Sequence, residues 1–492
     1  MRSLWLDTDR PDHRAEVSGQ HCDIAVVGAG LTGLTAAVLF ARAGASVAVL
    51  EARSVGAGAT GNTTAKISVL QGARLASIAA RQPTERLQQY VEANREGQAW
   101  LLHYCREHGI DHQIRDDHSY ASTPRGRKTV DSVLSAAQQA GLPVEPVDEL
   151  ELPYPTHGAV RLREQAQFDP MPALDTLARE LLDRGGLLAE GTRVREVGWR
   201  SPATIRTSAG TLTADRVVLA TGTPILDRGG FFARLEPLRS YALAFRTPAA
   251  IPSGMYLSVD QPTRSLRSVP AADGSELLLV GGNGHVVGRD GSTQTLVDDL
   301  TEWTARWFPG SQRTHAWSAQ DYRPIDELPY VGPLMPGNER ILVATGFDKW
   351  GMTNAVAAAL ALSGAVLGGS MPWARALRSW DPHEVRGVPS GTLLNAKVGA
   401  RMATDWLRPR PAAGKDDPAE GTGRIERDGV KPIAACTVDG VTHRRSAVCP
   451  HMHGIVNWNS AEQTWDCPLH GARYTATGRV LEGPVTNDLS PA

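Results

Sequence analysis

The chain has 492 residues, of which 41% are hydrophobic and 21% charged, and its formal net charge at pH 7 is −2. This length exceeds what one hydrophobic core supports, so we expect two or three domains, and the composition is that of a folded globular protein. The charge argues against a nucleic-acid-binding surface, which would need a basic excess. Residues 1–20 contain no apolar core typical of a signal peptide, so we expect a cytoplasmic protein.

A dinucleotide-binding motif begins the first predicted domain. The apolar, β-branched run 23–27 predicts a buried parallel strand, which leads into Gly28-Ala29-Gly30-Leu31-Thr32-Gly33. A predicted helix through Ala43 and a second strand over 46–50 follow, and Glu51 stands at the end of that strand. This is the βαβ fingerprint in its required context. The glycines permit a tight turn and close approach of a pyrophosphate at the helix N-terminus, and Glu51 is placed to bind the ribose hydroxyls.

Two later runs, 216–222 and 340–346, each predict a strand that ends in Thr-Gly. The chain therefore returns twice to the same sheet after long insertions. This organisation resembles the FAD-dependent D-amino-acid-oxidase-like (DAO) family over about residues 20–380. The local motifs that carry the resemblance are 51–64, 323–332 and 346–353. The resemblance implies an α/β fold, with an FAD-binding Rossmann-like domain of the glutathione-reductase type and an antiparallel-sheet substrate domain.

The resemblance also assigns the FAD-binding residues, which lie in the Gly-rich turn, after the second strand and at the points where the chain returns to the sheet. They are Gly28, Ala29, Gly30, Leu31, Thr32, Gly33, Glu51, Ala52, Arg53, Thr63, Thr64, Val194, Thr221, Gly222, Gly346, Gly351, Met352 and Thr353.

The run 350–373 contains no charged residue, which would also suit a transmembrane span. Because the run is rich in Ala and Gly and follows a sheet strand directly, we predict a buried helix and no membrane span. The positive end of this helix would stabilise negative charge on the reduced flavin.

The two insertions, about 71–184 and 226–324, are predicted to form the substrate side. Helix-like patterns over 87–107 and 129–140 precede strand-like patterns over 241–245 and 276–280, which predict an antiparallel sheet over the flavin. The run 281–284, Gly-Gly-Asn-Gly, lacks the helix, second strand and acid of a dinucleotide site, so it predicts a turn and no NAD(P)H domain. Four histidines lack metal-ligand spacing and are predicted to be ordinary: His103, His108, His112 and His118.

Three residues are candidates for a catalytic role. Lys66 would hydrogen-bond flavin N5 through water or assist oxygen or substrate, or it is a surface lysine. Arg323 would bind a substrate carboxylate in a bidentate manner, or it braces its loop. Lys349, with Tyr241 and Trp350, is a candidate pocket residue by position alone.

The C-terminal part is predicted to be a small β domain. Pro, Gly and charged residues dominate 408–423, which indicates a linker or surface crossing, and short strands with a hairpin turn at 439–440 follow. The predicted division is an extension 1–20, an FAD-dependent oxidoreductase domain 21–385, a connector 386–423 and a β domain 424–492. Within the oxidoreductase domain, the FAD-binding parts are about 21–70, 185–225 and 325–380.

This β domain carries a ligand motif, Cys449-x-His451 followed after fifteen residues by Cys467-x-x-His470. A tetrahedral zinc site uses the same four residue types. A Rieske [2Fe–2S] centre needs two Cys on one iron and two His on the other, so each loop would supply one of each. The arrangement resembles the Rieske family, as do the residues that follow: Gly471, Tyr474, Gly478, Gly483 and Pro484.

Many Rieske domains carry one more Cys in each loop, and the two form a disulfide. Here Gly454 and Leu469 stand at these places, so no disulfide is expected, which suits a reducing compartment. The other three cysteines, Cys22, Cys105 and Cys436, are expected to be buried or reduced.

Together the two resemblances imply that a flavin and an iron–sulfur cluster exchange electrons. We predict a dehydrogenase that transfers a hydride from an amine or amino-acid-like substrate to FAD and passes electrons singly through the cluster. The external acceptor would be a protein or a quinone, reached at exposed edges of His451 and His470. The alternatives are a reductase that feeds an oxygenase, or a redox-sensing or assembly protein. We do not expect a Rieske oxygenase, because its iron domain would follow the cluster and only 22 residues follow His470.

Overall fold

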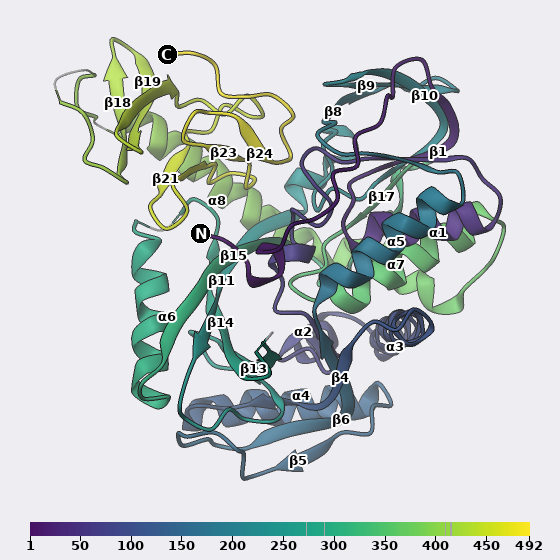
Figure 1. Cartoon of the computed structure of the whole chain (residues 1–492), viewed down its shortest axis with the longest axis vertical. Helices are drawn as coiled ribbons and strands as arrows, with labels where there is room; N and C mark the ends of the chain where they lie inside the picture. Colours follow the sequence, from purple (N-terminus) through teal and green to yellow (C-terminus); the bar gives the residue numbers. More distant parts are fainter. Residues whose placement is uncertain (272, 290, 409, 414–415) are drawn as a thin grey trace.

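The computed structural model describes residues 1–492 except 272, 290, 409 and 414–415. The dinucleotide motif lies in a largely parallel sheet (Figure 1). In spatial order its main strands are β16 (Tyr330–Met335), β17 (Asn338–Thr345), β10 (Gly210–Leu219), β1 (His21–Val27), β2 (Val47–Leu50) and β7 (Leu187–Ala189). β8 (Val194–Val197) and β9 (Ala203–Thr207) extend β10 in antiparallel pairing. Because β10 pairs in parallel with β1 and β17 pairs in parallel with β10, the chain returns twice to this sheet, as predicted.

Helices cover this sheet. α1 (Leu31–Arg42) and α7 (Gly351–Val366) contact its strands and each other, while α3 (Thr84–Glu107) packs on α7 and α5 (Pro170–Asp183) packs on α1. The uncharged α7 is buried along most of its length, which agrees with the prediction of an interior helix. Among the described residues, no helix is long and apolar enough to span a bilayer.

The two insertions, together with β3 (Lys66–Ile67), form a second, mainly antiparallel sheet, which extends from the middle to the bottom of the view in Figure 1. In spatial order its strands are β15 (Gln312–Pro324), β11 (Leu235–Arg246), β14 (Glu276–Val286), β13 (Arg264–Pro270), β12 (Met255–Ser258), β4 (His112–Tyr120), β6 (Ala159–Phe168) and β3 (Lys66–Ile67), with β5 (Glu145–Val147) paired to β6. Its helices are α2 (Arg74–Arg81), α4 (Arg127–Gln139) and α6 (Gln294–Trp307).

One local prediction for this sheet was wrong. Residues 281–284 do not form a turn, because β14 continues through them to Val286. Gly281 and Gly282 pair with β11 on one side and β13 on the other. A side chain at Gly282 would lie 2.3 Å from the carbonyl oxygen of Thr263, so the glycines allow close strand packing here.

The predicted connector contains a helix that we did not expect, α8 (Val388–Leu407). Residues 409 and 414–415 of this connector lie outside the described residues. Two small antiparallel sheets follow: β18 (Gly423–Asp428), β19 (Lys431–Val438) and β20 (Val441–Ser446); and β21 (Asn457–Asn459), β22 (Thr464–Asp466), β23 (Arg473–Thr475) and β24 (Val480–Glu482). The described 3₁₀ helices are η1 (Leu4–Leu6), η2 (Thr60–Asn62), η3 (Pro124–Gly126), η4 (Arg228–Ala233), η5 (Pro372–Leu377) and η6 (Pro382–Gly387).

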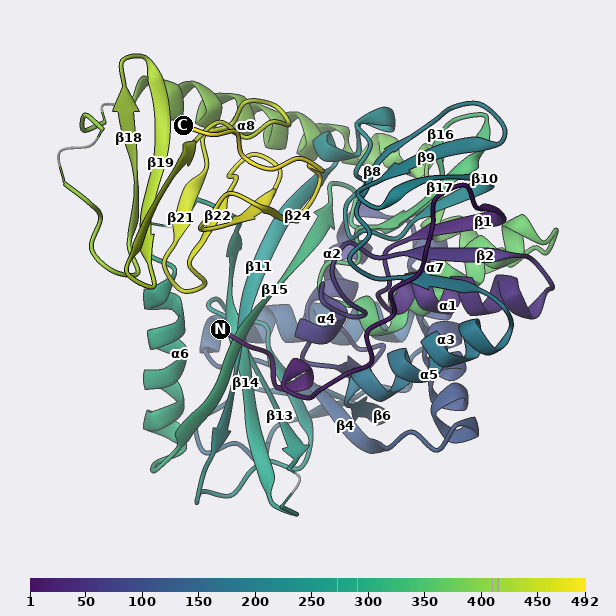
Figure 2. The ribbon, with the colours of Figure 1, turned by 45° about the horizontal axis from the view of Figure 1, so that its top comes forward.

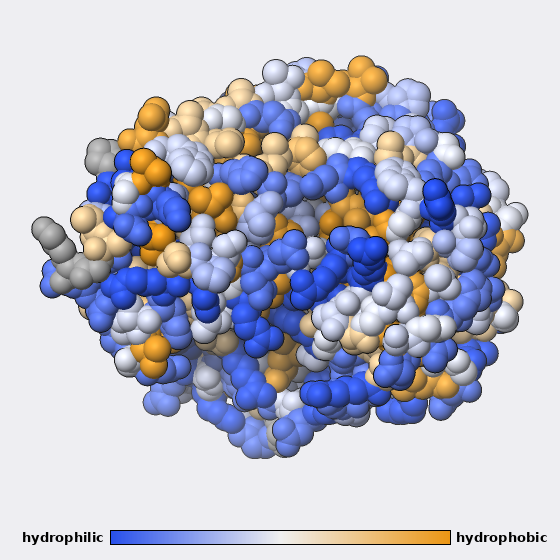
Figure 3. All heavy atoms as spheres, turned by 90° about the horizontal axis from the view of Figure 1, so that it is seen from above, coloured by the Kyte–Doolittle hydropathy of each residue, from blue (hydrophilic) through white to orange (hydrophobic). Residues whose placement is uncertain are grey.

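The small β domain lies against the ends of β11 and β15, with α8 along one side of it (Figures 1 and 2). Hydrophilic residues cover most of the face that Figure 3 shows, with separate small hydrophobic groups between them. The two small sheets share a hydrophobic core, to which Val398 and Met402 of α8 add partly buried side chains. α8 therefore packs with the C-terminal β domain.

Candidate functional site

A cavity of about 400 Å³ extends from the turn between β1 and α1 to the start of α7. Most of the residues predicted to bind FAD line it: Gly28, Gly30, Leu31, Thr32, Glu51, Ala52, Arg53, Thr63, Thr64, Val194, Thr221, Gly222, Gly351 and Met352. The other four do not line it: Ala29, Gly33, Gly346 and Thr353. The fold thus brings together, in one cavity, residues that are far apart along the chain.

The end of the cavity at α1 fits a dinucleotide diphosphate. Gly28 has φ +107°, and a Cβ there would lie 2.5 Å from the carbonyl oxygen of Ala220. A Cβ on Gly33 would lie 1.9 Å from the carbonyl oxygen of Gly28, so the helix can approach the strand only with glycine at this position. Gly30 caps α1 without a side chain, so the positive helix end faces the cavity. The Glu51 carboxylate accepts a hydrogen bond from the Ala29 amide at 2.9 Å and lines the same wall.

Two of the three catalytic candidates line the other end of this cavity. Lys66 is buried, its Nζ donates to the carbonyl oxygen of Tyr256 at 2.7 Å, and burial lowers its pKa to about 8. Lys349 also lines the cavity, and burial lowers its pKa as well. Arg323 lies outside the lining and forms an ion pair with Glu236 of β11. This placement corresponds to the bracing alternative for Arg323.

The backbone around Lys349 is held in an uncommon conformation. Asp348 and Lys349 have φ values of +46° and +73°, in the left-handed region that side chains usually disfavour. The buried Arg74 guanidinium binds Asp348 at 2.5 Å and Glu327 at 2.6 Å. These two ion pairs stabilise the turn that leads into α7 and thereby place Lys349 in the cavity wall.

Four consecutive residues of β15 that were not predicted also line the cavity: Ala319, Gln320, Asp321 and Tyr322. Asp321 accepts a hydrogen bond from the Lys349 amide at 2.6 Å, and burial raises the pKa of its carboxyl group to about 6. A polar residue in a strand carries no motif of its own, so only the tertiary structure reveals this acid.

In the second site the four predicted metal ligands come together in two neighbouring loops. The thiols of Cys449 and Cys467 are both buried, and the ring centroids of His451 and His470 are 4.9 Å apart. The Nδ1 atoms of both histidines are buried and have no hydrogen-bond partner among the described residues. Two thiols and two unpartnered imidazole nitrogens fit the ligand set of a [2Fe–2S] cluster with mixed ligands.

Other contacts support these loops. The Tyr474 hydroxyl lies 3.1 Å from the Cys449 sulfur, and hydrogen bonds to sulfur tune the potential of such clusters. A Cβ at Gly454 would lie 2.6 Å from Leu469 Cδ1, so these two residues do face one another across the loops. All five cysteines lie in the described part of the chain, and none forms a disulfide.

One prediction about the histidines was wrong. Their edges are not exposed, because η4 of the larger part of the chain covers them. His451 Nε2 lies 2.5 Å from Asp227 Oδ1, and its side chain is only 4% exposed. The Phe232 ring stands edge-on to both imidazoles, with centroid distances of 5.3 and 5.2 Å. The sequence could not indicate this contact, since Asp227 and His451 are far apart along the chain.

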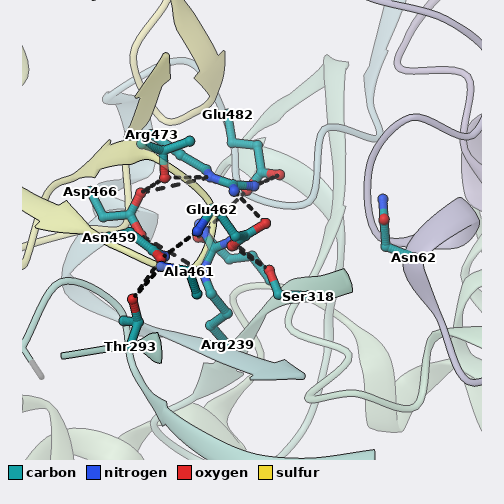
Figure 4. A network of polar contacts seen from close by, with 12 residues as sticks. Asn62, Arg239, Thr293, Ser318, Asn459, Ala461, Glu462, Asp466, Arg473 and Glu482 are labelled. Atoms are coloured by element: carbon teal, nitrogen blue, oxygen red, sulfur yellow. Dashed lines mark hydrogen bonds and ion pairs between the residues drawn. The ribbon is translucent and has the colours of Figure 1, made fainter. Parts of the chain in front are cut away.

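The two sites also share structural elements. Leu481, Glu482 and Gly483, at the end of β24, form part of the wall of the FAD-binding cavity. Beside them lies a buried ionic network, shown in Figure 4, which joins Arg239 of β11 to carboxylates of the small β domain. Arg239 is fully buried and lies 2.6 Å from Glu462, 3.9 Å from Asp466 and 3.8 Å from Glu482.

Charge complementarity stabilises this network. Burial alone would raise the pKa of Glu462, but the adjacent Arg473 and Arg239 lower it to about 2. Arg473 contacts all three carboxylates, at 2.5 to 3.7 Å. A carboxylate with a lowered pKa stabilises the fold above its ordinary pKa, and this contribution is lost as the pH falls towards the folded-state value.

These sites define the class of the protein, a flavin-dependent oxidoreductase joined to an iron–sulfur domain. The chain belongs to the FAD dependent oxidoreductase (DAO) family, whose model matches residues 23–364, and residues 414–491 match the model of the Rieske [2Fe-2S] domain. Its cofactors are therefore FAD and a [2Fe–2S] cluster, which resolves the zinc alternative that the four ligands left open.

One relative aligns with this chain over almost the full length of both proteins. It is a putative Rieske 2Fe-2S iron-sulfur protein, YhfW, of Bacillus subtilis (strain 168), 30% identical over 494 residues that cover 99% of this chain and 96% of the relative. Two solved structures show the fold of the larger part. Glycine oxidase from Geobacillus kaustophilus aligns with a TM-score of 0.62 and 20% identity, over 74% of this chain and 99% of that one. L-proline dehydrogenase from P. horikoshii aligns with a TM-score of 0.59 and 18% identity, over 75% of this chain and 98% of that one.

Proposed function

We propose that this oxidoreductase is a dehydrogenase that oxidises an amine or amino-acid-like substrate and passes the electrons singly to an external acceptor. The observation that carries the proposal is the shared wall. Residues 481–483 of the Rieske domain line the FAD-binding cavity, and the histidine ligands face the flavoprotein part instead of solvent. Such an arrangement favours electron transfer between the two cofactors within one chain.

Bound FAD accepts two electrons as a hydride, and the [2Fe–2S] cluster accepts one electron at a time. Lys66 and Lys349 place two amino groups in the cavity wall, which suits a substrate that carries a carboxylate. An amine must be neutral before it gives up a hydride. With a pKa near 6, the Asp321 carboxylate would be ionised at neutral pH and would accept the proton of an ammonium substrate. The names of the two proteins of similar fold, glycine oxidase and L-proline dehydrogenase, are consistent with this substrate class.

The first test is an anaerobic titration of the purified protein with candidate amines and amino acids, followed by absorbance and EPR. We expect one of them to bleach the flavin absorbance before the signal of a reduced mixed-ligand cluster grows. If NADH reduces the flavin and no amine does, the protein is a reductase and the proposal is wrong. If neither reduces it, a sensing or assembly role replaces the dehydrogenase.

A variant without the cluster tests the order of the two steps. His451→Ala removes one ligand, so we expect loss of the cluster, retention of FAD, unchanged flavin reduction by the substrate and slow turnover with a one-electron acceptor. His453→Asn is the matched control, because His453 is an exposed loop residue with φ +56°, a conformation that Asn tolerates. Normal turnover of His451→Ala without a cluster would contradict the relay. The assignments of FAD-binding residues and of domain boundaries at 385 and 423 remain predictions.

A further inference from the structure

One side chain connects the wall of the FAD-binding cavity to a residue next to a cluster ligand. Gln320 of β15 lines the cavity, and its Nε2 donates to the carbonyl oxygen of Gly471 at 2.8 Å. Gly471 directly follows His470. The same Nε2 donates to the hydroxyl of Tyr322 at 2.8 Å, and Tyr322 also lines the cavity. From the cavity wall to the ligand, the path therefore consists of one hydrogen bond and a few covalent bonds.

The surrounding residues fix the orientation of the Gln320 amide. Arg239 has only N–H donors, and its Nη2 donates to Gln320 Oε1 at 2.6 Å. The oxygen of the amide must therefore face Arg239, which leaves Nε2 to face Tyr322 and Gly471. Because Gln320 is only 8% exposed, water does not compete readily for these hydrogen bonds.

Gly471 permits this contact. Its φ is +77°, and a Cβ there would lie 2.6 Å from Pro237 Cβ and 2.8 Å from Gln320 Nε2. Only glycine lets the backbone of the second ligand loop lie directly on β11 and β15. The loop that carries His470 is thus in close contact with the strand that lines the cavity.

We propose that Gln320 is the positioning residue for electron transfer between the flavin and the histidine-ligated iron, with Tyr322 as the preceding member of the path. This inference rests on the relay in the proposed function but not on the identity of the substrate. In each transfer the reduced flavin loses one electron and one ferric ion of the cluster becomes ferrous. Over the two transfers the flavin also loses the proton that came with the hydride, which passes to solvent. The cluster must be reoxidised by an external one-electron acceptor before it accepts the second electron.

The test uses the full-length holoprotein and flash photoreduction with 5-deazaflavin and EDTA, so no substrate is required. The rate of electron transfer from flavin to cluster is followed by absorbance for the wild type, Gln320→Leu and Tyr322→Phe. Loading of both cofactors and both midpoint potentials are measured for each variant, because a purely structural role would change loading and not the rate in loaded molecules.

The matched control is Asn457→Leu. Asn457 Nδ2 donates to the carbonyl oxygen of Gly288 at 2.7 Å, so it makes the same kind of amide-to-carbonyl contact between the two parts of the chain, but one that involves neither Gln320 nor Tyr322. We expect Gln320→Leu to slow the transfer severalfold at unchanged potentials, Tyr322→Phe to slow it less, and Asn457→Leu to leave it unchanged.

Tyr322→Phe retains the ring and its packing, so it remains informative if Gln320→Leu loads poorly. A wild-type rate in Gln320→Leu, or in Tyr322→Phe where Gln320→Leu fails to load, would overturn the inference. An equal slowing in Asn457→Leu would overturn it too. If the wild type itself shows no transfer from flavin to cluster, the relay of the proposed function fails as well.

Discussion

The ionisation of Asp321 connects the chemistry of the cavity to pH. The carboxyl group is buried in the cavity wall, and its pKa is raised to about 6 by that burial. Below this pH the group is neutral, and above it a negative charge lies beside the cavity. Because a flavin gains electron density when it is reduced, this charge opposes reduction above pH 6 and has no effect below it.

Asp321→Asn should therefore raise the midpoint potential of the bound flavin above pH 6 and leave it unchanged below about pH 5. The expected difference is on the order of 1 kcal/mol in the free energy of flavin reduction. Spectroelectrochemical titrations of both proteins from pH 5 to pH 9 would measure it. Coincident curves over the whole range would show that Asp321 remains neutral or lies too far from the flavin.

At the scale of single residues, the sequence predicted the roles of those that belong to contiguous motifs. Cys449, His451, Cys467 and His470 stand in two short patterns whose residue types define the cluster chemistry. Gln320 and Asp321 could not be predicted, because one polar residue in a strand is compatible with many environments. The burial of His451 depends on Asp227, which approaches only when the whole chain has folded.

The crossing of two helices determines where α7 presents its N-terminus to the cavity. α3 packs on α7 at Gly97, where a Cβ would lie 2.3 Å from the carbonyl oxygen of Thr353 and 2.9 Å from the amide nitrogen of Ala357. Both atoms belong to the backbone of α7, so they cannot move without displacing the helix. A glycine inside α3 thus sets the distance between the two helices.

Gly97→Ala should destabilise the protein by roughly 1–3 kcal/mol, as is usual for overpacking, and weaken FAD binding through the displaced α7. Urea unfolding and FAD titration of the apoprotein would measure both effects. Gly399→Ala on α8 is the control, since no atom lies within 4 Å of its Cβ position. Alanine there should stabilise by about 0.5–1 kcal/mol through helix propensity. Stabilisation by both variants would contradict the proposed contact.

Among the elements, those with a strong hydrophobic pattern were predictable. The strands of the βαβ unit, α7 and the helical runs near α3 and α4 follow from periodicity and from their neighbours. α8 was missed because most of its residues are exposed, so no apolar stripe marks it in the sequence. The glycines of 281–284 suggested a turn, whereas close strand packing keeps them within β14.

The two parts of the molecule are joined by the network around Arg239 (Figure 4). Removal of this guanidinium would leave Glu462, Asp466 and Glu482 with Arg473 as their main counter-charge. Buried charges that lose a partner are costly, because the protein interior solvates them poorly.

Arg239→Met should therefore destabilise the protein by roughly 3–5 kcal/mol and loosen the Rieske domain from the flavoprotein part. Urea unfolding, together with limited proteolysis of the connector, would detect both effects. The control is Arg246→Met on the same strand, whose ion pair with Asp273 is half exposed and should be worth at most about 1 kcal/mol. Equal effects of the two substitutions would show that the network does not join the domains.

For the whole molecule, the sequence predicted the two cofactor-binding folds but not how they meet. Each fold depends on motifs within its own part of the chain. Their interface depends on Arg239, Asp227 and Phe232, whose partners are more than two hundred residues away and have no local signature.

The shared cavity wall also bears on how such a chain evolves. Leu481, Glu482 and Gly483 belong to the Rieske domain but line the FAD-binding cavity. A recombination event that deleted the Rieske domain would therefore open the FAD-binding cavity of the flavoprotein part. Natural selection would then act on the two domains as one inherited unit, and substitutions on either side of the wall would be expected to change together among descendants.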